Sequence, residues 1–451
     1  MPPIYGAIET TRQDPATLDN VTNSRTPLLA SSSRSSPDEE VIQKGVLDGT
    51  AQMAGCIGNL SNTLLGTGLL AFPMAMASGG LIPGIFTCVF SGATAGLGLW
   101  FLSRCAAQCP PRRSSFFAVA QLTYPSFSVL IDAAIAIKCF GVSISYLIII
   151  KGLMPSVVRS LHYVSHSKSE LPWWIVSGHF WITVLMSILV PLCFLKRLDS
   201  LRHTSYVALF SVVYVVIIVV ACHFRPPEGS AEPGEWHLVH FTPSFISNFP
   251  VQVFAFTCAQ NLFPIYNELA SNTQERMNFV IGSSIGGAMV TYEVMLSTSK
   301  VAAEFGPFAQ VGPDIVHPCR NCLDKALALP DEDDDDVSVH GPATNMSELK
   351  HVVLTSGIII AGFTIAYFVD NLQMVLSFVG STGSTTITLI LPGLFYYKLF
   401  GTRPDHPRRL KWASVGLTIY GFVIFVFCLT YNIWTVSRNE EPGPHIKSFL
   451  V

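Results

Sequence analysis

The chain has 451 residues, of which 50% are hydrophobic and 13% are charged, against about 25% charged residues in an average soluble domain. A chain this apolar cannot cover its surface with polar side chains, so its composition excludes a disordered chain and argues against a soluble enzyme. The net charge of −3 leaves no strongly basic domain, so we expect the lipid bilayer as a partner and no nucleic acid.

The amino-terminal residues 1–50 are rich in Ser, Thr, Pro and Asp and contain no long apolar run. Such a segment cannot bury enough apolar surface to fold, so a disordered cytosolic tail is expected here. A transmembrane domain is expected over residues 51–435, followed by a short tail over residues 436–451.

Ten apolar runs are each long enough to cross a bilayer, which takes about 20 helical residues. The first two share residues 51–103, a stretch without any charged residue or histidine. Inside lipid, backbone groups must form hydrogen bonds within their own segment, so the runs predict an all-α, polytopic helical bundle. The other eight runs are residues 127–150, 172–195, 205–224, 244–267, 277–299, 352–369, 371–397 and 412–434.

Lys and Arg predict which loops face the cytosol, because cytosolic loops carry an excess of both. The basic loop at residues 104–113 places the amino terminus in the cytosol, although the loop expected after the third run, with Lys151, departs from this pattern. Residues 398–411 are also basic, yet nine runs precede them, which places them on the opposite side. One more crossing within residues 300–351 would remove the conflict. That interval contains fourteen charged residues, which are costly at the bilayer centre, so a charged loop is expected there.

The first apolar run contains a polar segment, Gly58–Pro73 (GNLSNTLLGTGLLAFP). Spacings of three, four and seven residues put its polar side chains on one helix face, and such groups within a span usually face the protein interior or a wet cavity. Two glycines around Thr67 favour unwinding of the helix, which would free backbone groups to bind a ligand. Close helix packing through small residues explains this segment equally well. The residues concerned are Asn59, Asn62, Thr63, Gly66, Thr67 and Gly68.

A second interrupted run, at residues 254–269 (FAFTCAQNLFPIYNEL), favours ligand binding. Polar residues cluster in its middle, and Pro264 removes one backbone donor. Interrupted spans at corresponding positions in two halves of a chain are the best sequence indication of a transporter site. The amino termini of half-helices would face a substrate carboxylate, and freed carbonyls would suit a cation. The predicted substrate-binding residues are Asn59, Gly66, Thr67, Gly68, Thr257, Gln260 and Asn261.

Lys138 lies in the middle of the third run, where a charged residue is expensive and often functional. It could carry a proton or act as a fixed cation in place of a bound ion; a snorkelling or structurally paired lysine is the alternative. Ser381–Thr388 is polar but small, which favours helix packing. Cys319 and Cys322 form a close pair without a second pair, so no metal site is expected. The sequence contains no catalytic triad or phosphate-binding glycine loop, so we expect no enzyme and no cofactor.

These segments, together with IAIKCFGVSISYLIII (135–150), VHPCRNCLDK (316–325) and LSFVGSTGSTTITLILPGLFYYKLF (376–400), resemble the amino acid/auxin permease family. The similarity is strongest to the fungal vacuolar and the sodium-coupled neutral amino acid transporters. The resemblance implies eleven helices in the inverted-repeat fold of the bacterial leucine transporter, an amino acid substrate, and H⁺ or Na⁺ coupling. It also implies that Asn62 helps to hold the coupling cation and that Gly66–Gly68 is the unwound substrate segment.

The chain departs from the family pattern at three places. It has Ala259 where the family usually has His, and Lys151-Gly152 where the family usually reads Gly-Asp. The eighth helix, which the family places before VHPCRNCLDK, is missing, and Lys300–Val316 stands there instead. The loop charges require a further crossing in the same interval.

The expected function is secondary active transport of an amino acid by alternating access across an internal, vacuolar membrane, with proton coupling preferred. The plasma membrane is the alternative location. A sensor that binds an amino acid without transporting it, and an inactive variant without the eighth helix, are the alternative functions. The sequence identifies no protein partner.

Overall fold

The computed structural model describes residues 49, 51–66, 68–69, 72, 78–164, 171–194, 202–224, 238–239, 243–297, 348–401, 403–404 and 406–438. All of them belong to one compact unit, residues 47–451. The expected tail at residues 1–50 and the expected charged loop at residues 300–351 lie almost entirely outside the described residues, as do Thr67, Cys319 and Cys322.

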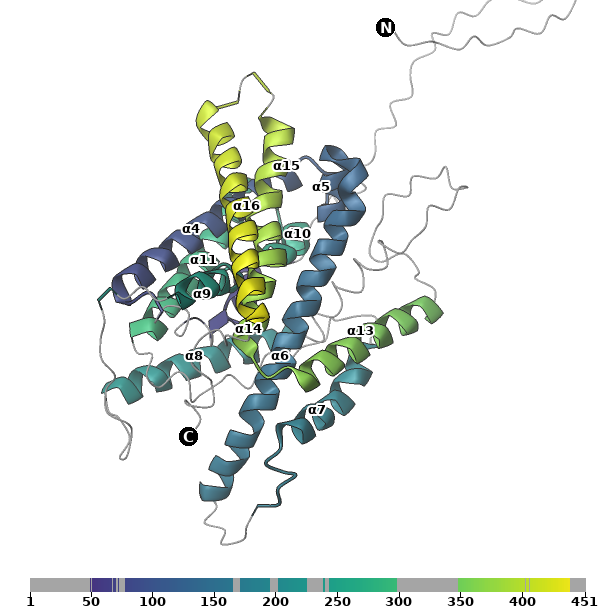
Figure 1. The fold of residues 1–451 in the computed structure, drawn as a ribbon. Coiled ribbons are helices and arrows are strands. Elements are labelled where there is room, and N and C mark those ends of the chain that lie inside the picture. Colours follow the sequence, from purple (N-terminus) through teal and green to yellow (C-terminus); the bar gives the residue numbers. More distant parts are fainter. Residues whose placement is uncertain are drawn as a thin grey trace, which may run out of the picture. The chain divides into compact units, whose positions relative to one another are not determined.

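The described residues form helices and no strands, which confirms the predicted all-α class (Figure 1). Ala51 and Leu269 form an isolated parallel bridge. The first helices are α2 (Met53–Leu64), α4 (Leu81–Ala106), α5 (Phe116–Thr123), the 3₁₀ turn η1 (Pro125–Phe127), α6 (Ser128–Val164), α7 (Gly178–Cys193) and α8 (Arg202–Phe224). They are followed by α9 (Ser244–Ala255), α10 (Ala259–Glu268), α11 (Gln274–Ser297), α13 (Glu348–Phe368), α14 (Leu372–Val379), the π-helical segments η3 (Gly380–Ser384) and η4 (Thr386–Ile390), α15 (Leu391–Phe400) and α16 (Arg408–Ser437).

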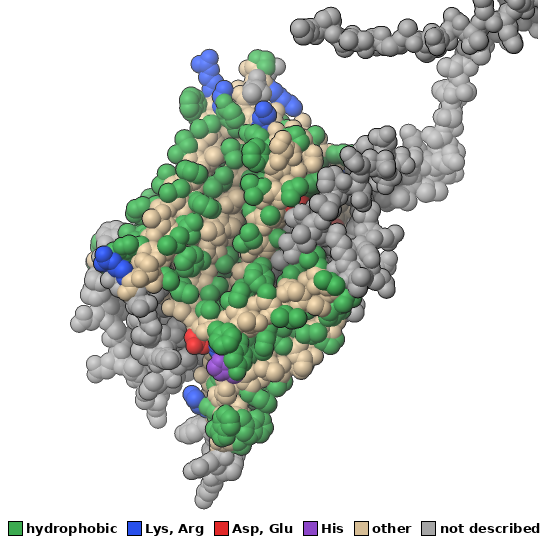
Figure 2. Space-filling model, turned by 45° about the vertical axis from the view of Figure 1, so that its right-hand side comes forward, with side chains coloured by type: hydrophobic (Ala, Val, Ile, Leu, Met, Phe, Trp, Pro, Cys, Tyr) green, Lys and Arg blue, Asp and Glu red, His purple; other side chains and the backbone are tan. Residues whose placement is uncertain are grey.

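Several helices have the length and composition of membrane spans. The four long apolar helices are Leu81–Ala106, Pro125–His162, Leu372–Phe400 and Arg408–Ser437, and three shorter ones are Gly178–Pro191, Leu209–Ile218 and Val352–Phe368. Large apolar side chains such as Phe86, Phe210 and Phe427 are exposed on these helices, and Figure 2 shows hydrophobic side chains spread over one whole face. Such a surface is unsuited to water and is typical of a protein that faces lipid. The count of ten spans remains a prediction.

Two groups of helices position the centre of the molecule. In one group, α2, α4, α10 and α11 pack together; in the other, α6 packs with α7, α13 and α14. Helix α9 contacts α4, α14, η3 and α16. The two interrupted runs of the sequence, α2 and α9–α10, therefore lie in the interior of the helical unit.

The two strongly basic loops lie at the same end of the described unit. Arg403 Nη2 donates to Gln108 Oε1 over 3.2 Å, and Figure 2 shows Lys and Arg side chains gathered at the end where α15 and α16 are joined. This placement agrees with a cytosolic position for both loops. It requires an even number of crossings between them, whereas the predicted runs give an odd number. Most of the interval 300–351, in which a further crossing would remove this conflict, lies outside the described residues.

The third predicted run ends too early. The structure continues α6 from Ser128 to Val164 with Pro155 inside the helix, so the predicted end at residue 150 is wrong. Lys151 is therefore buried within a helix and is not a loop charge. Its disagreement with the loop-charge pattern has no bearing on the orientation of the chain.

The contact between α4 and η4 leaves no room for a side chain at Gly98. A Cβ added to Gly98 of α4 would overlap the carbonyl oxygen of Thr388 in η4. We expect Gly98→Ala to destabilise the protein by about 1–3 kcal/mol, because overpacking forces the two helices apart. Thermal unfolding of the purified protein in detergent measures the loss.

Gly96→Ala on the same helix is the matched control. A Cβ at Gly96 would lie 3.9 Å from Ile285 Cγ2, an ordinary contact. Because alanine is a better helix former than glycine, this variant should match or exceed the stability of the unchanged chain. Equal stability of the two variants would show that the α4–η4 contact is not tight.

Candidate functional site

The first interrupted run is broken where its glycines predict. Helix α2 ends at Leu64, and the amide of Leu65 still donates to Ser61 O over 2.8 Å. The next described turn is tighter, with the amide of Leu69 donating to Gly66 O over 3.0 Å. Thr67 lies outside the described residues, so the break is defined by its two flanking glycines.

The second interrupted run is broken at residues 256–258. Helix α9 ends at Ala255 and α10 begins at Ala259. The polar residues of the run mark this break, but Pro264 does not, because it lies inside α10. The donor that Pro264 removes is therefore missing within α10 and not at the break. The amides of Phe256 and Thr257 keep carbonyl partners in α9, while the first amides of α10 form a helix amino terminus.

The two breaks meet. Asn261 Nδ2 donates to Thr63 Oγ1 over 2.6 Å, which links α10 to α2. A Cβ added to Gly68 would lie 2.7 Å from the Cα of Ala255, so the backbones touch at the ends of both half-helices. Both interrupted helices thus contribute to one junction, which we call the break junction: residues 63–66, 68 and 255–261.

The predicted substrate residues differ in how they relate to the break junction. Thr257 is buried, donates to Val253 O over 2.8 Å and accepts from Thr388 Oγ1 over 3.2 Å. Gln260 is half-buried, and its Oε1 is buried without a hydrogen-bond partner in the described part of the chain. Asn59 is exposed, so the structure does not bring its side chain into this junction. The roles of all these residues in binding remain predictions.

Lys138 of α6 packs against η3, a segment that contacts α9. Its side chain is 3% exposed, which excludes the snorkelling alternative because a snorkelling lysine reaches water. A Cβ added to Gly383 of η3 would overlap Lys138 Cβ.

The segment Ser381–Thr388 lies across η3 and η4, two π-helical turns, a distortion that often occurs at functional sites. Gly380 lies so close to Pro250 O that a Cβ would overlap it, which explains a small residue there. Ser384 Oγ is buried and has no hydrogen-bond partner among the residues that the structure describes. The helix-packing interpretation therefore accounts for the glycines but not for this hydroxyl.

Tyr292 is a residue that the sequence did not identify. Its hydroxyl lies 2.5 Å from Leu64 O and 2.9 Å from Ala255 O, the last residues of α2 and α9. Its ring stacks on Phe72 at 4.4 Å and meets the edge of Phe256 at 5.1 Å between centroids. A tyrosine in the middle of an apolar run was the available signal, because a buried phenol usually finds a hydrogen-bond partner.

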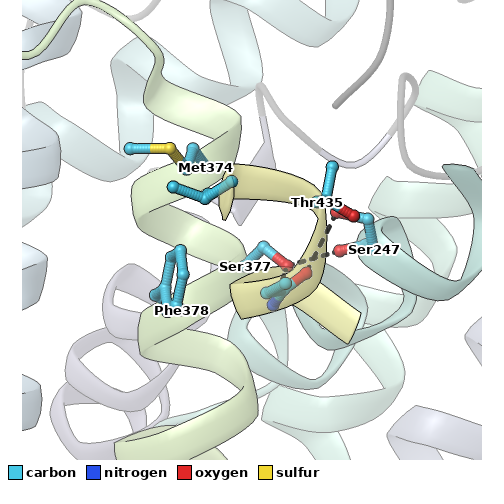
Figure 3. A pocket seen from close by; sticks show the side chains of 7 residues that line it. Ser247, Met374, Ser377, Phe378 and Thr435 are labelled. Atoms are coloured by element: carbon cyan, nitrogen blue, oxygen red, sulfur yellow. Dashed lines mark hydrogen bonds between the residues drawn. The ribbon is translucent and has the colours of Figure 1, made fainter. Parts of the chain in front are cut away.

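A second polar cluster lies at the other end of α9 (Figure 3). Ser247 Oγ donates to Asn432 Oδ1 over 3.1 Å, and Asn432 Nδ2 donates to Ser377 Oγ over 2.7 Å. Ser377 Oγ in turn donates to Ser247 O, and Gln373 donates to Asn248 nearby. These buried bonds join α9, α14 and α16 around the small pocket of Figure 3. The sequence analysis did not find this cluster.

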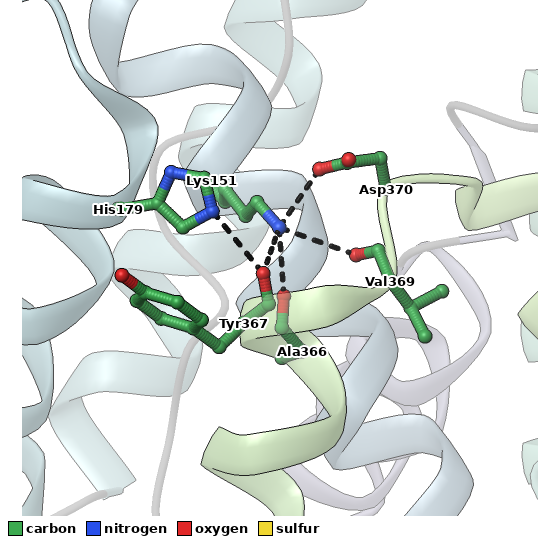
Figure 4. Close-up of polar contacts among 6 residues, drawn as sticks. All are labelled: Lys151, His179, Ala366, Tyr367, Val369 and Asp370. Atoms are coloured by element: carbon green, nitrogen blue, oxygen red, sulfur yellow. Dashed lines mark hydrogen bonds and ion pairs between the residues drawn. The ribbon is translucent and has the colours of Figure 1, made fainter.

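A third group surrounds Lys151 (Figure 4). Lys151 Nζ donates to Ala366 O over 3.0 Å and to Tyr367 O over 2.7 Å, and it lies 2.8 Å from Asp370 Oδ1. His179 Nε2 lies 3.2 Å from Tyr367 O. The lysine that departs from the family pattern thus caps the carboxyl end of α13.

Comparison with known proteins agrees with this arrangement. The family described as "Transmembrane amino acid transporter protein" matches residues 49–298 and 315–437, which is well over half of the chain. The gap in the match falls where the expected eighth helix is missing from the sequence.

The alignments with curated relatives extend over most of this chain and most of each relative. Vacuolar amino acid transporter 5 of Schizosaccharomyces pombe is 37% identical over 86% of this chain and 96% of its own. Vacuolar amino acid transporter 6 of Saccharomyces cerevisiae is 31% identical over 82% and 96%. Sodium-coupled neutral amino acid symporter 2 of Danio rerio is 22% identical over 88% and 86%. The resemblance drawn from the sequence is confirmed: this chain belongs to the transmembrane amino acid transporter family, whose members are transporters and not enzymes.

Proposed function

We propose that the protein is a secondary active transporter that carries an amino acid across the vacuolar membrane by alternating access, coupled to protons. The observation that supports this most directly is the break junction, where two interrupted helices are joined by the bond between Asn261 and Thr63. Two unwound segments side by side in the interior of a membrane protein provide backbone groups for a small polar solute. The breaks in the first and sixth spans support an inverted-repeat fold.

Each end of the substrate has suitable groups at the junction. The amino terminus of α10 presents the positive pole of a helix dipole, which favours a carboxylate. The carboxyl ends of α2 and α9 carry the negative poles of two helix dipoles, which favour an ammonium group or a cation nearby. Gln260 Oε1 adds a buried acceptor that lacks a partner among the described residues. A zwitterion is the ligand whose two charges fit this arrangement.

Lys138 and Asn62 are the proposed coupling residues. Lys138 supplies a positive charge next to η3 without a bound ion, or carries the transported proton itself. The relatives of higher identity carry vacuolar names, and the sodium-coupled relative is more distant. The charge of Lys138 and the greater distance of the sodium-coupled relative support proton coupling over sodium coupling. The names of the relatives support the vacuolar membrane over the plasma membrane.

Uptake by reconstituted vesicles tests the proposal. The purified chain is placed in liposomes, and uptake of each radiolabelled amino acid is measured with and without an imposed pH gradient. We expect gradient-driven uptake of a subset of amino acids. Background uptake of every amino acid by correctly folded protein would exclude transport. Ligand-induced thermal stabilisation without uptake would instead favour the sensor, and a transcript containing extra codons between 299 and 318 would favour an aberrant variant without the eighth helix.

Asn62→Ala is expected to abolish the ion dependence of uptake, because the family resemblance assigns Asn62 to the site of the coupling cation and an amide oxygen is a suitable cation ligand. Initial uptake rates are measured with and without the gradient in the same vesicles. Gly58→Ala on the same helix is the control, since a Cβ there meets nothing within 4 Å. Unchanged ion dependence in Asn62→Ala would remove this residue from the cation site.

A further inference from the structure

The break junction brings together two groups that repel each other. Leu64 and Ala255 are the last residues of α2 and α9, so their carbonyls belong to the free carboxyl ends of two helices. Each such end carries about half a negative charge. Both carbonyls are nevertheless within hydrogen-bond distance of one hydroxyl, that of Tyr292. A donor or a cation between them is required to hold the two ends together in the membrane interior.

Tyr292 is built to supply that donor. Its side chain is completely buried, and its ring is fixed by stacking on Phe72 and by edge contact with Phe256. Phe72 and Phe256 are themselves in edge contact, with centroids 6.1 Å apart. The hydroxyl is also the next atom beyond Ala255 that a Cβ on Gly68 would meet, at 3.5 Å. The phenol is therefore held where the end of α9 approaches the residues that follow α2.

We propose that Tyr292 is the positioning residue of this transporter: its hydroxyl holds the carboxyl ends of α2 and α9 together, in the place of a bound cation, and so preorganises the substrate site. The inference rests on the proposed function, because preorganisation has a consequence only if the junction binds a substrate. The two half-helices then move as one body, and the site does not lose its geometry when it is empty.

Hydrogen exchange measures this role without any transport. Tyr292→Phe keeps the ring and removes the oxygen. The matched control is Tyr420→Phe, because the Tyr420 hydroxyl is buried without a hydrogen-bond partner among the described residues. In the full-length protein in lipid nanodiscs, we expect amides of residues 64–69 and 255–259 to exchange about tenfold faster in Tyr292→Phe, the effect of losing one buried hydrogen bond. Tyr420→Phe should match the unchanged chain.

Transport kinetics distinguish positioning from a general loss of stability. We expect Tyr292→Phe to raise the KM for the amino acid about tenfold with a smaller change in maximal rate per folded molecule, whereas a purely structural defect lowers the number of active molecules and leaves KM unchanged. Equal exchange and equal KM in Tyr292→Phe and Tyr420→Phe would overturn the inference. Altered exchange in Tyr292→Phe, with no uptake by any variant, would support the positioning role and reject the proposed function.

If Tyr292→Phe does not fold, Phe72→Leu tests the positioning role instead. This variant keeps the Tyr292 hydroxyl and removes the phenyl ring that stacks on the Tyr292 ring. We expect faster exchange in the same two segments, by a smaller factor than in Tyr292→Phe. Exchange equal to that of Tyr420→Phe in folded Phe72→Leu would overturn the inference.

Discussion

Replacing Lys138 by methionine is expected to lower amino acid uptake at least about 100-fold, an increase of about 2.7 kcal/mol in the transport barrier, with little loss of folded protein. Lys138 is buried against η3, and the described part of the chain gives it no ion-pair partner. Methionine has similar length and no charge, so the substitution removes a costly buried ammonium. The fold is spared, while the positive charge beside η3 is lost. Uptake into vesicles and thermal unfolding are measured on the same preparation.

Lys138→Arg separates the two possible roles of the lysine. Arginine keeps its charge over the whole working pH range, so it can replace a fixed cation but cannot release a proton. If Lys138 is a fixed cation, the arginine variant retains part of the uptake and its dependence on the pH gradient. If Lys138 carries the proton, gradient-driven uptake is lost in both variants. Normal gradient-driven uptake in Lys138→Met would leave Lys138 as a packing residue.

The all-α membrane class followed from the sequence because hydrophobic length is a local property. A run such as residues 412–434 can form only a helix in lipid, and α16 contains it entirely. The position of a helix end depends less on the local sequence. The charge of Lys151 predicts a loop, yet α6 continues past it because its ammonium finds carbonyl partners in α13. A sequence does not show that such partners will be within reach.

In the candidate site, too, local features were predictable from the sequence and contacts between distant segments were not. Gly66, Gly68 and the polar residues around Thr257 predicted both breaks because unwinding depends on the residues at the break itself. Contacts between distant segments were not predictable. The hydroxyl of Tyr292 acts on residues 228 and 37 positions away, and the bonds of Ser377 with Ser247 and Asn432 join three separate helices. Which faces of the helices meet is decided by the whole packing arrangement, and one sequence does not reveal it.

Replacing Lys151 by methionine is expected to destabilise the protein by about 3 kcal/mol, the value of two hydrogen bonds to a charged group. In the structure, Lys151 Nζ satisfies the carbonyls of Ala366 and Tyr367 at the carboxyl end of α13, where no intrahelical donor is available. Methionine fills the same space but leaves these carbonyls without that donor. The turn into α14 should loosen as a result. Thermal unfolding in detergent measures the change, and a loss of this size should lower the midpoint by roughly 5 °C or more.

Asp370→Asn is the control that separates carbonyl capping from the ion pair. The Asp370 side chain is 73% exposed and that of Lys151 is 7% exposed, and ion pairs with an exposed member contribute below about 1 kcal/mol. Removing the carboxylate charge while keeping the lysine should therefore change the midpoint little. An effect of Asp370→Asn as large as that of Lys151→Met would assign the stabilisation to the ion pair. A small effect in the control and a large one in Lys151→Met would mean that this lysine, absent from the family pattern, acts as the carboxyl cap of α13.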